Sequence, residues 1–133
     1  MVYALVVEDE EDIRNLLVEQ LQDKGCMVKK ADNGAVALQR INEQTPDIIF
    51  VDVNMPVMDG FLLISELQEH PDTFEIPIVV VTAIDLPEVT ERADALGVKL
   101  VLSKPWIQQE LDLVIAQAAI QLNLEWEILA TQT

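Results

Sequence analysis

Short apolar runs recur along the chain, and stretches with helical spacing separate them. The strongest runs lie at 47–52 and 76–82, where β-branched and aromatic residues follow one another with few interruptions. Such runs are typical of parallel strands that are buried on both faces of a sheet. Weaker runs at 2–7, 26–31 and 98–102 bring the number of predicted strands to five.

Apolar residues three or four positions apart predict a helix after each of these strands. The first helix should end at Gly25 and the fourth at Gly97, because glycine readily adopts the backbone conformation that closes a helix. The third should follow Gly60 and stop near Pro71, and the last should follow Ser103-Lys104-Pro105. This alternation predicts an α/β fold, with a doubly wound parallel sheet covered by helices on both faces.

The composition fits one globular domain and argues against two classes of partner. The chain has 133 residues, half of them hydrophobic, which suffices for one substantial core. Its 24 acidic and 8 basic residues give a formal net charge of −16, which should repel phosphate backbones and anionic lipid. We therefore expect neither nucleic acid nor membrane among its direct partners.

The sequence also favours a cytoplasmic protein. No apolar run approaches the roughly 18 residues that a membrane-spanning helix needs, and no signal-peptide pattern opens the sequence. Cys26 is the one cysteine, which excludes an internal disulfide and a cysteine-based metal site. Its apolar neighbours predict a buried, unreactive thiol.

Polar residues follow four of the predicted strands at the point where each strand ends. Glu8 and Asp9 follow the first strand, and Asp52 ends the third. Thr82 ends the fourth strand, and Lys104 follows the fifth. The carboxyl ends of parallel strands share one edge of a sheet. The flavodoxin-like strand order 2-1-3-4-5 would therefore place Glu8 and Asp9 beside Asp52.

Three carboxylates so close together would repel one another unless a cation lay among them. Oxygen ligands with few other protein donors suit Mg²⁺. A lysine and a hydroxyl on the opposite side favour a site that stabilises a phosphoryl group. The residues themselves thus predict phosphoryl transfer onto Asp52, with its carboxylate as the nucleophile.

Four ordered motifs resemble the receiver domain of two-component response regulators. The resemblance covers roughly residues 2–120, and its motifs are Val7-Glu8-Asp9-Glu10, Asp52-x-x-Met55-Pro56-x-Met58-Asp59-Gly60, Val81-Thr82-Ala83 and Lys104-Pro105. Each motif is weak by itself, but the ordered set is specific. It implies a flavodoxin-like (βα)5 domain that acts as a phosphorylation-dependent signalling module of a two-component system.

The resemblance implies a role for each matched acid. Asp52 matches the phosphoacceptor, which takes the phosphoryl group from a phosphohistidine and also contacts the metal. Asp9 matches a direct Mg²⁺ ligand, and the backbone carbonyl of Asn54 completes the protein ligands. Glu8 matches an acid that usually acts through water; it stands where many relatives have Asp, a change that such a role tolerates.

The resemblance assigns the other side of the site as well. Thr82 matches the hydroxyl that bonds the phosphoryl group, with the Ala83 N–H beside it. Lys104 matches the cation that pairs first with the acids and then with a phosphoryl oxygen, and Pro105 matches a proline that follows a cis peptide. Val101 is a departure, because many relatives carry Tyr or Phe there and a valine cannot swing a large ring. We expect phosphorylation to be retained and its transmission to differ.

The last predicted helix continues beyond the receiver-like part, which spans 1–120. Residues 121–133 still carry large apolar side chains, namely Leu122, Leu124, Trp126, Ile128 and Leu129. So apolar a segment is expected to be buried. The helix should overshoot the sheet and pack against a second subunit, in a homodimer, or against another partner. The alternative is that the segment folds back onto its own domain.

The first hypothesis for function is a single-domain response regulator whose output is protein–protein contact, since the chain leaves no room for an output domain. Its partners would be a histidine kinase or histidine phosphotransfer protein and a downstream protein. Its only catalysis would be its own phosphorylation and dephosphorylation. The alternative is a receiver-like adaptor whose output does not depend on phosphorylation, which Val101 favours. A Mg²⁺-dependent phosphatase of the haloacid dehalogenase type is disfavoured, because Asn54 stands where that class has a second acid.

Overall fold

The computed structural model describes residues 2–54, 59–83 and 87–122, and it shows the predicted alternation of strands and helices. The strands are β1 (Tyr3–Val7), β2 (Met27–Ala31), β3 (Ile48–Asp52), β4 (Ile78–Thr82) and β5 (Leu100–Ser103). The helices are α1 (Glu11–Asp23), α2 (Gly34–Glu43), α3 (Gly60–Gln68), α4 (Pro87–Ala95) and α5 (Gln108–Leu122). The α/β fold class is therefore confirmed.

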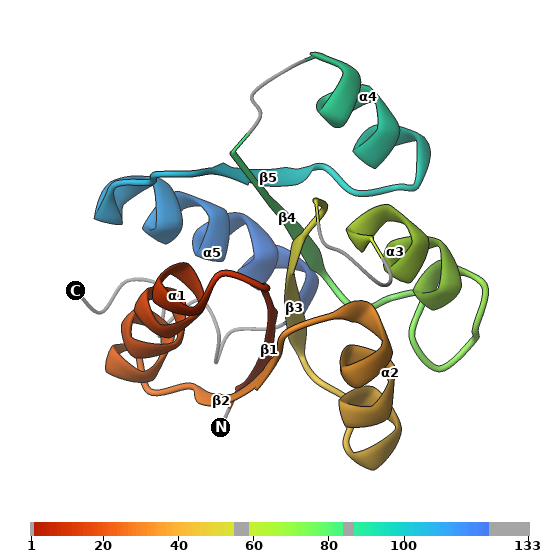
Figure 1. The fold of residues 1–133 in the computed structure, drawn as a ribbon, viewed down its shortest axis with the longest axis horizontal. Helices are drawn as coiled ribbons and strands as arrows, with labels where there is room; N and C mark the ends of the chain where they lie inside the picture. Colours follow the sequence, from red (N-terminus) through yellow and green to blue (C-terminus); the bar gives the residue numbers. More distant parts are fainter. Residues whose placement is uncertain (1, 55–58, 84–86, 123–133) are drawn as a thin grey trace.

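The strands form one parallel sheet in the order β2-β1-β3-β4-β5 (Figure 1). This is the predicted doubly wound order 2-1-3-4-5. Asp52 at the end of β3 is opposite Val81 in β4, and Thr82 at the end of β4 is opposite Ser103 in β5. The register thus brings the carboxyl ends of these strands, and the polar residues that follow them, to one edge of the sheet.

Helices cover both faces of the sheet. Successive side chains of a strand point to opposite faces, and in the central strands both faces carry apolar residues that need to be buried. Helices α1 and α5 pack on the side that receives Ala4, Val6 and Phe50. Helices α2, α3 and α4 pack on the side that receives Leu5 and Ile49 (Figure 1). Strands β1, β3 and β4 are consequently buried along their whole length, which explains their continuous apolar sequences.

Glycines and side-chain caps set several helix ends. Gly25 after α1 and Gly97 after α4 have φ angles of 88° and 82°, in the left-handed region that glycine adopts most easily. Both predicted helix ends are confirmed. Asn33 and Asp59 cap the amino ends of α2 and α3, where each side chain accepts a backbone N–H at 2.9 Å.

Helix α5 begins at Gln108, shortly after Pro105, so the predicted final helix is confirmed. The residues between carry the chain from the sheet edge to the flank of α1. There the Trp106 indole Nε1 donates a hydrogen bond to Gln20 Oε1 at 2.8 Å. This contact links the residues between Pro105 and α5 to α1.

Residues 121–133 were expected to pack against a second subunit or partner. Almost all of this segment lies outside the described residues. Helix α5 is described as far as Leu122. The homodimer therefore stays a prediction of the sequence. Within the described part of the chain, no helix combines the length and apolar character needed to cross a membrane.

Candidate functional site

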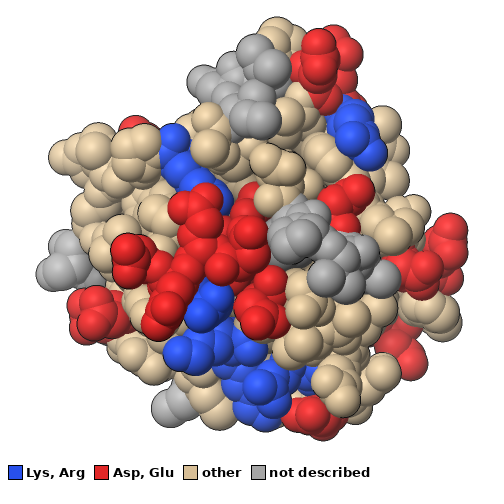
Figure 2. Space-filling model, in the orientation of Figure 1, with Lys and Arg blue, Asp and Glu red and all other residues tan. Residues whose placement is uncertain are grey.

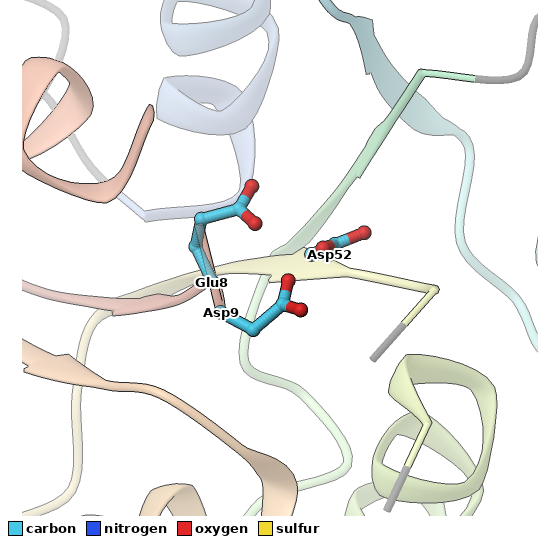
Figure 3. Close-up of side chains that lie close together, drawn as sticks. All are labelled: Glu8, Asp9 and Asp52. Carbon is cyan, nitrogen blue, oxygen red and sulfur yellow. The ribbon is translucent and has the colours of Figure 1, made fainter. Parts of the chain in front are cut away.

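Three carboxylates converge at the carboxyl edge of the sheet (Figure 3). Glu8 and Asp9 follow β1 and Asp52 ends β3, and one oxygen from each acid lies within 4.8 Å of the other two. Because β1 pairs directly with β3, the strand order accounts for this meeting. Figure 2 shows acidic side chains covering the centre of this face, with basic groups beside them.

Two of the three acids are buried. Glu8 and Asp52 are each 2% exposed, whereas Asp9 is more open to solvent. Strand β3 delivers Asp52 directly from the core, and Asp52 Oδ1 accepts a hydrogen bond from the backbone N–H of Asn54 at 3.0 Å. A buried carboxylate is costly unless it is paired, so its partners decide what the site can do.

Lys104 lies among these acids. Its Nζ is 2.7 Å from Glu8 Oε1, 3.4 Å from Asp52 Oδ2 and 3.5 Å from Glu10 Oε1. The lysine side chain is 7% exposed, so solvent screens its contacts with the buried acids only weakly. The structure thus places the predicted lysine at the site, with Glu8 as its nearest partner.

Burial, and after it hydrogen bonding with Glu8, raises the pKa of Asp52 to about 7. The hydrogen bond from the Asn54 N–H acts in the opposite direction and is outweighed. For Lys104, burial acts to lower the pKa, but the contact with Glu8 and the charge of Asp52 outweigh it, so the pKa is raised. The ammonium stays charged and offsets only part of the negative charge around it.

Thr82 and Lys104 are held together through the backbone. The N–H of Lys104 donates a hydrogen bond to the carbonyl of Thr82 at 2.8 Å, and the Lys104–Pro105 peptide is cis, as the resemblance implied. Thr82 is buried, whereas Ala83 is exposed. Since β4 is also paired with β3, Thr82 lies on the strand end next to Asp52, and Lys104 follows β5 one strand further out.

Val101 borders a hollow of about 520 Å³ between β5 and α4. Pro87, Thr90 and Glu91 of α4 form the facing wall, and Val98 lies at one end. The short valine side chain leaves this space open, where a tyrosine or phenylalanine ring would extend into it. The departure noted in the sequence is therefore visible in the shape of this surface.

Two residues beside the site were missed by reasoning from sequence. The sequence predicted no role for Glu10 at the site, yet its carboxylate lies 3.5 Å from Lys104 Nζ. Arg14 Nη1 donates to the backbone carbonyls of Glu8 and Asp9, at 3.0 and 3.5 Å, and so holds that turn. The position of Glu10, two residues after Glu8 in the β1–α1 turn, was a usable signal; no pattern marked Arg14.

Gly60 lets α3 begin directly against the end of β3. A Cβ atom at this position would collide with the carbonyl oxygen of Asp52 and would lie 2.6 Å from Val53 Cα. Residues 55–58, which complete this sequence motif, lie outside the described residues. Only a glycine allows this close approach, and it thereby fixes the backbone that carries Asp52.

The donor set at this edge fits a hard divalent cation. Carboxylate oxygens from three residues lie within 4.8 Å of one another, and oxygen ligands of this kind suit Mg²⁺. Burial, and then the neighbouring Glu8, raises the pKa of Asp52, and a bound cation would favour its charged form. Together with the strand order, this edge defines an α/β domain whose chemistry lies at the switch point of a doubly wound sheet.

Comparison with known proteins identifies the family. The sequence profile of the response regulator receiver domain matches residues 4–116. The chain belongs to this family, and the resemblance seen in its motifs is confirmed. Members of the family are phosphorylation-dependent signalling modules rather than conventional enzymes.

Three similar proteins show how far the likeness extends. An uncharacterized 14.6 kDa protein in the sodA1 3′ region of Leptolyngbya boryana is 36% identical over 113 residues, covering 85% of this chain and 86% of that protein. The regulatory protein AtoC of Escherichia coli K12 is 31% identical over 119 residues, which cover 90% of this chain but 25% of AtoC. The structure of the chemotaxis protein CheY4 of Vibrio cholerae matches with a TM-score of 0.84 at 31% identity, covering 89% of this chain and 98% of CheY4.

Proposed function

We propose that this receiver domain changes its protein contacts when Asp52 carries a phosphoryl group. The observation that supports this most directly is the position of Asp52. Its carboxylate lies within 4.8 Å of those of Glu8 and Asp9 and 3.4 Å from Lys104 Nζ. The acids offer a place for Mg²⁺, and the lysine offers a positive charge for the incoming phosphoryl oxygens.

In the proposed reaction, a carboxylate oxygen of Asp52 attacks the phosphorus of a phosphohistidine. A P–O bond forms, the P–N bond breaks, and the imidazole of the donor leaves. Lys104 would turn from the acids to one phosphoryl oxygen, and the Thr82 hydroxyl would donate to another. In dephosphorylation, water attacks the phosphorus, the P–O bond to Asp52 breaks, and the free carboxylate and inorganic phosphate are the products. The domain would thus catalyse only its own phosphorylation and dephosphorylation.

The proposed protein ligands of the metal are Asp9, Asp52 and the backbone carbonyl of Asn54, with Glu8 acting through water. Bound Mg²⁺ would offset the charge of the acids and of the phosphoryl group. Glu8 would also hold Lys104 at the site before any phosphoryl group arrives. The distance of 2.7 Å between Glu8 Oε1 and Lys104 Nζ supports this role.

The proposed donor is a histidine kinase or a histidine phosphotransfer protein, and the proposed output is contact with a downstream protein. The net charge of −16 argues against nucleic acid or an anionic membrane as the direct target. A cytoplasmic location stays a prediction, which cell fractionation would test.

Phosphorylation with a small donor tests the proposal. After incubation with Mg²⁺ and acetyl phosphate, wild type should gain one labile phosphoryl group by mass spectrometry, and Asp52→Asn should gain none. Asp72→Asn is the matched control, because it makes the same chemical change at an exposed acid in the α3–β4 connection. The absence of any adduct on wild type, with acetyl phosphate and with beryllofluoride, would refute the proposal.

An adaptor whose output ignores phosphorylation is the second candidate, and Val101 is the observation that favours it. Because position 101 carries valine, no aromatic ring at this position can turn inward when the Thr82 hydroxyl moves. Backbone amide NMR shifts with and without beryllofluoride separate the two functions. The switch predicts changes that spread through β4, α4 and β5, whereas the adaptor predicts changes confined to the loops around Asp52.

A further inference from the structure

A hollow of about 680 Å³ lies at the edge of the sheet opposite to Asp52, beside the carboxyl-terminal end of α5. The α3–β4 connection, the α4–β5 connection and the last turns of α5 form its walls, and its apolar lining includes Phe74, Ile76, Pro77, Leu100 and Ile120. Phe74 is 49% exposed and Ile120 is 78% exposed. These two exposed apolar side chains share the hollow with polar ones, Glu75 and Lys99 among them, and exposed apolar groups gathered in a hollow mark a contact site.

The chain itself supplies the nearest occupant. Ile120 and Gln121 belong to the wall of the hollow, and the segment 123–133 follows them almost directly. Its eleven residues include four large apolar ones, Leu124, Trp126, Ile128 and Leu129. A segment of this length can extend for up to about 36–40 Å, which is ample to reach across a hollow that begins where the segment starts.

We propose that the segment 123–133 folds back into this hollow of its own chain and covers Phe74 and Ile120 with its apolar side chains. The sequence left three surfaces open for this apolar segment, namely a second subunit, another partner and its own domain. The covalent attachment of the segment to α5 favours its own domain, because a short linker gives the segment an effective concentration in the millimolar range at the hollow. A second copy present at micromolar concentration cannot compete through equal contacts.

Docking would tie the end of α5 to the connections that lead into β4 and β5. A partner that binds this surface would first have to displace the segment. The hollow adjoins the amino ends of β4 and β5, whereas Asp52 lies at the carboxyl end of β3. The docking therefore requires neither Mg²⁺ nor a phosphoryl group, and it stands or fails independently of the proposed function.

Disulfide cross-linking of the full chain tests this proposal. The test variant carries Glu75→Cys, in the wall of the hollow, and Thr131→Cys, in the segment, so that no apolar contact is removed. Cys26 can remain, because burial raises the pKa of its thiol to about 11 and leaves little reactive thiolate. The matched control combines Thr131→Cys with Glu88→Cys, at the exposed start of α4.

Mild oxidation at low micromolar protein, in EDTA and without a phosphodonor, should close an internal disulfide in the test variant roughly tenfold faster than in the control. Equal rates in the two variants, or no disulfide in either, would overturn the proposal. A disulfide-linked dimer of the test variant would also overturn it, since a second copy would then fill the hollow.

Proteolysis gives a second measurement that needs no added cysteine. Docking should shield Glu125 and Glu127 from a glutamate-specific protease. Phe74→Asp should raise the rate of cleavage at these two sites several-fold. Leu62→Asp should not, because Leu62 is equally exposed, at 49%, but lies outside the hollow. An unchanged rate for Phe74→Asp, or an equal rise for both variants, would contradict docking.

Discussion

Lys104 Nζ lies 2.7 Å from Glu8 Oε1, and the two side chains are 7% and 2% exposed. Removing one partner from a buried ion pair leaves the other charge uncompensated, so this pair depends on both of its members. Glu8 has one methylene more than the aspartate found in many relatives, which extends its reach toward the lysine. In the unmodified domain, Glu8 thus both shares the acidic cluster and holds its counter-ion.

Replacing Glu8 should weaken the binding of Mg²⁺. Glu8→Gln removes one carboxylate from the cluster, and we expect an affinity roughly 10–100-fold lower by isothermal titration calorimetry. Glu8→Asp keeps the charge and should retain most of the affinity. Glu11→Gln, at an exposed acid of α1, is the control for net charge. Equal weakening by Glu8→Gln and Glu11→Gln would mean that overall charge, and not position, sets the affinity.

Without a divalent cation, the fold should lose stability as the pH rises from about 4 to about 7. Asp52 has a pKa of about 7 in the folded protein against a usual value of 3.8, so over this range the folded protein keeps a proton that the unfolded chain has released. The contribution of that proton is complete below 3.8 and is lost as the pH rises through 7. The loss should amount to roughly 1–4 kcal/mol.

Urea unfolding in EDTA at about pH 5 and about pH 8 measures the larger part of this loss. Asp52→Asn should remove most of the difference between the two values and should be the more stable protein at the higher pH. Asp72→Asn should keep the wild-type difference. A fold that gained stability with rising pH would contradict the raised pKa of Asp52.

Gly60→Ala should damage both the fold and the site. Its Cβ would collide with the backbone of Asp52 and Val53, which we expect to cost roughly 1–3 kcal/mol and to lower Mg²⁺ affinity. Gly97→Ala is a useful comparison, because nothing lies within 4 Å of its Cβ and its cost of about 1 kcal/mol comes from the backbone angle alone. It should leave Mg²⁺ affinity unchanged. Urea unfolding and calorimetry on both variants would show whether the two losses separate.

Val101→Tyr should be tolerated, because the hollow of about 520 Å³ beside it offers room for the ring. The free energy of unfolding should change by less than roughly 1 kcal/mol, and phosphoryl uptake from acetyl phosphate should be unaffected. Chemical denaturation and the rate of phosphorylation measure the two quantities. A loss of uptake would show that position 101 acts on the reaction itself and not only on its readout.

The sheet order and the meeting of Glu8, Asp9 and Asp52 could be predicted because both follow from local patterns. Buried parallel strands leave continuous apolar runs, and the polar residues after them reach one edge. The contact between Trp106 and Gln20 could not be predicted, because its hydrogen bond joins residues with a sequence separation of 86. That Glu8 is the nearest partner of Lys104 could not be predicted either, because it depends on side-chain lengths and conformations that the sequence does not fix.

The hydrogen bond of 2.8 Å from the Lys104 N–H to the Thr82 carbonyl joins main-chain atoms. It therefore does not depend on which side chains the edge strand β5 carries. Substitutions in β5, such as one at Val101, can change the surface next to α4 while Lys104 and Thr82 keep their relative positions. The lineage of this chain could therefore exchange binding partners without rebuilding its reaction centre.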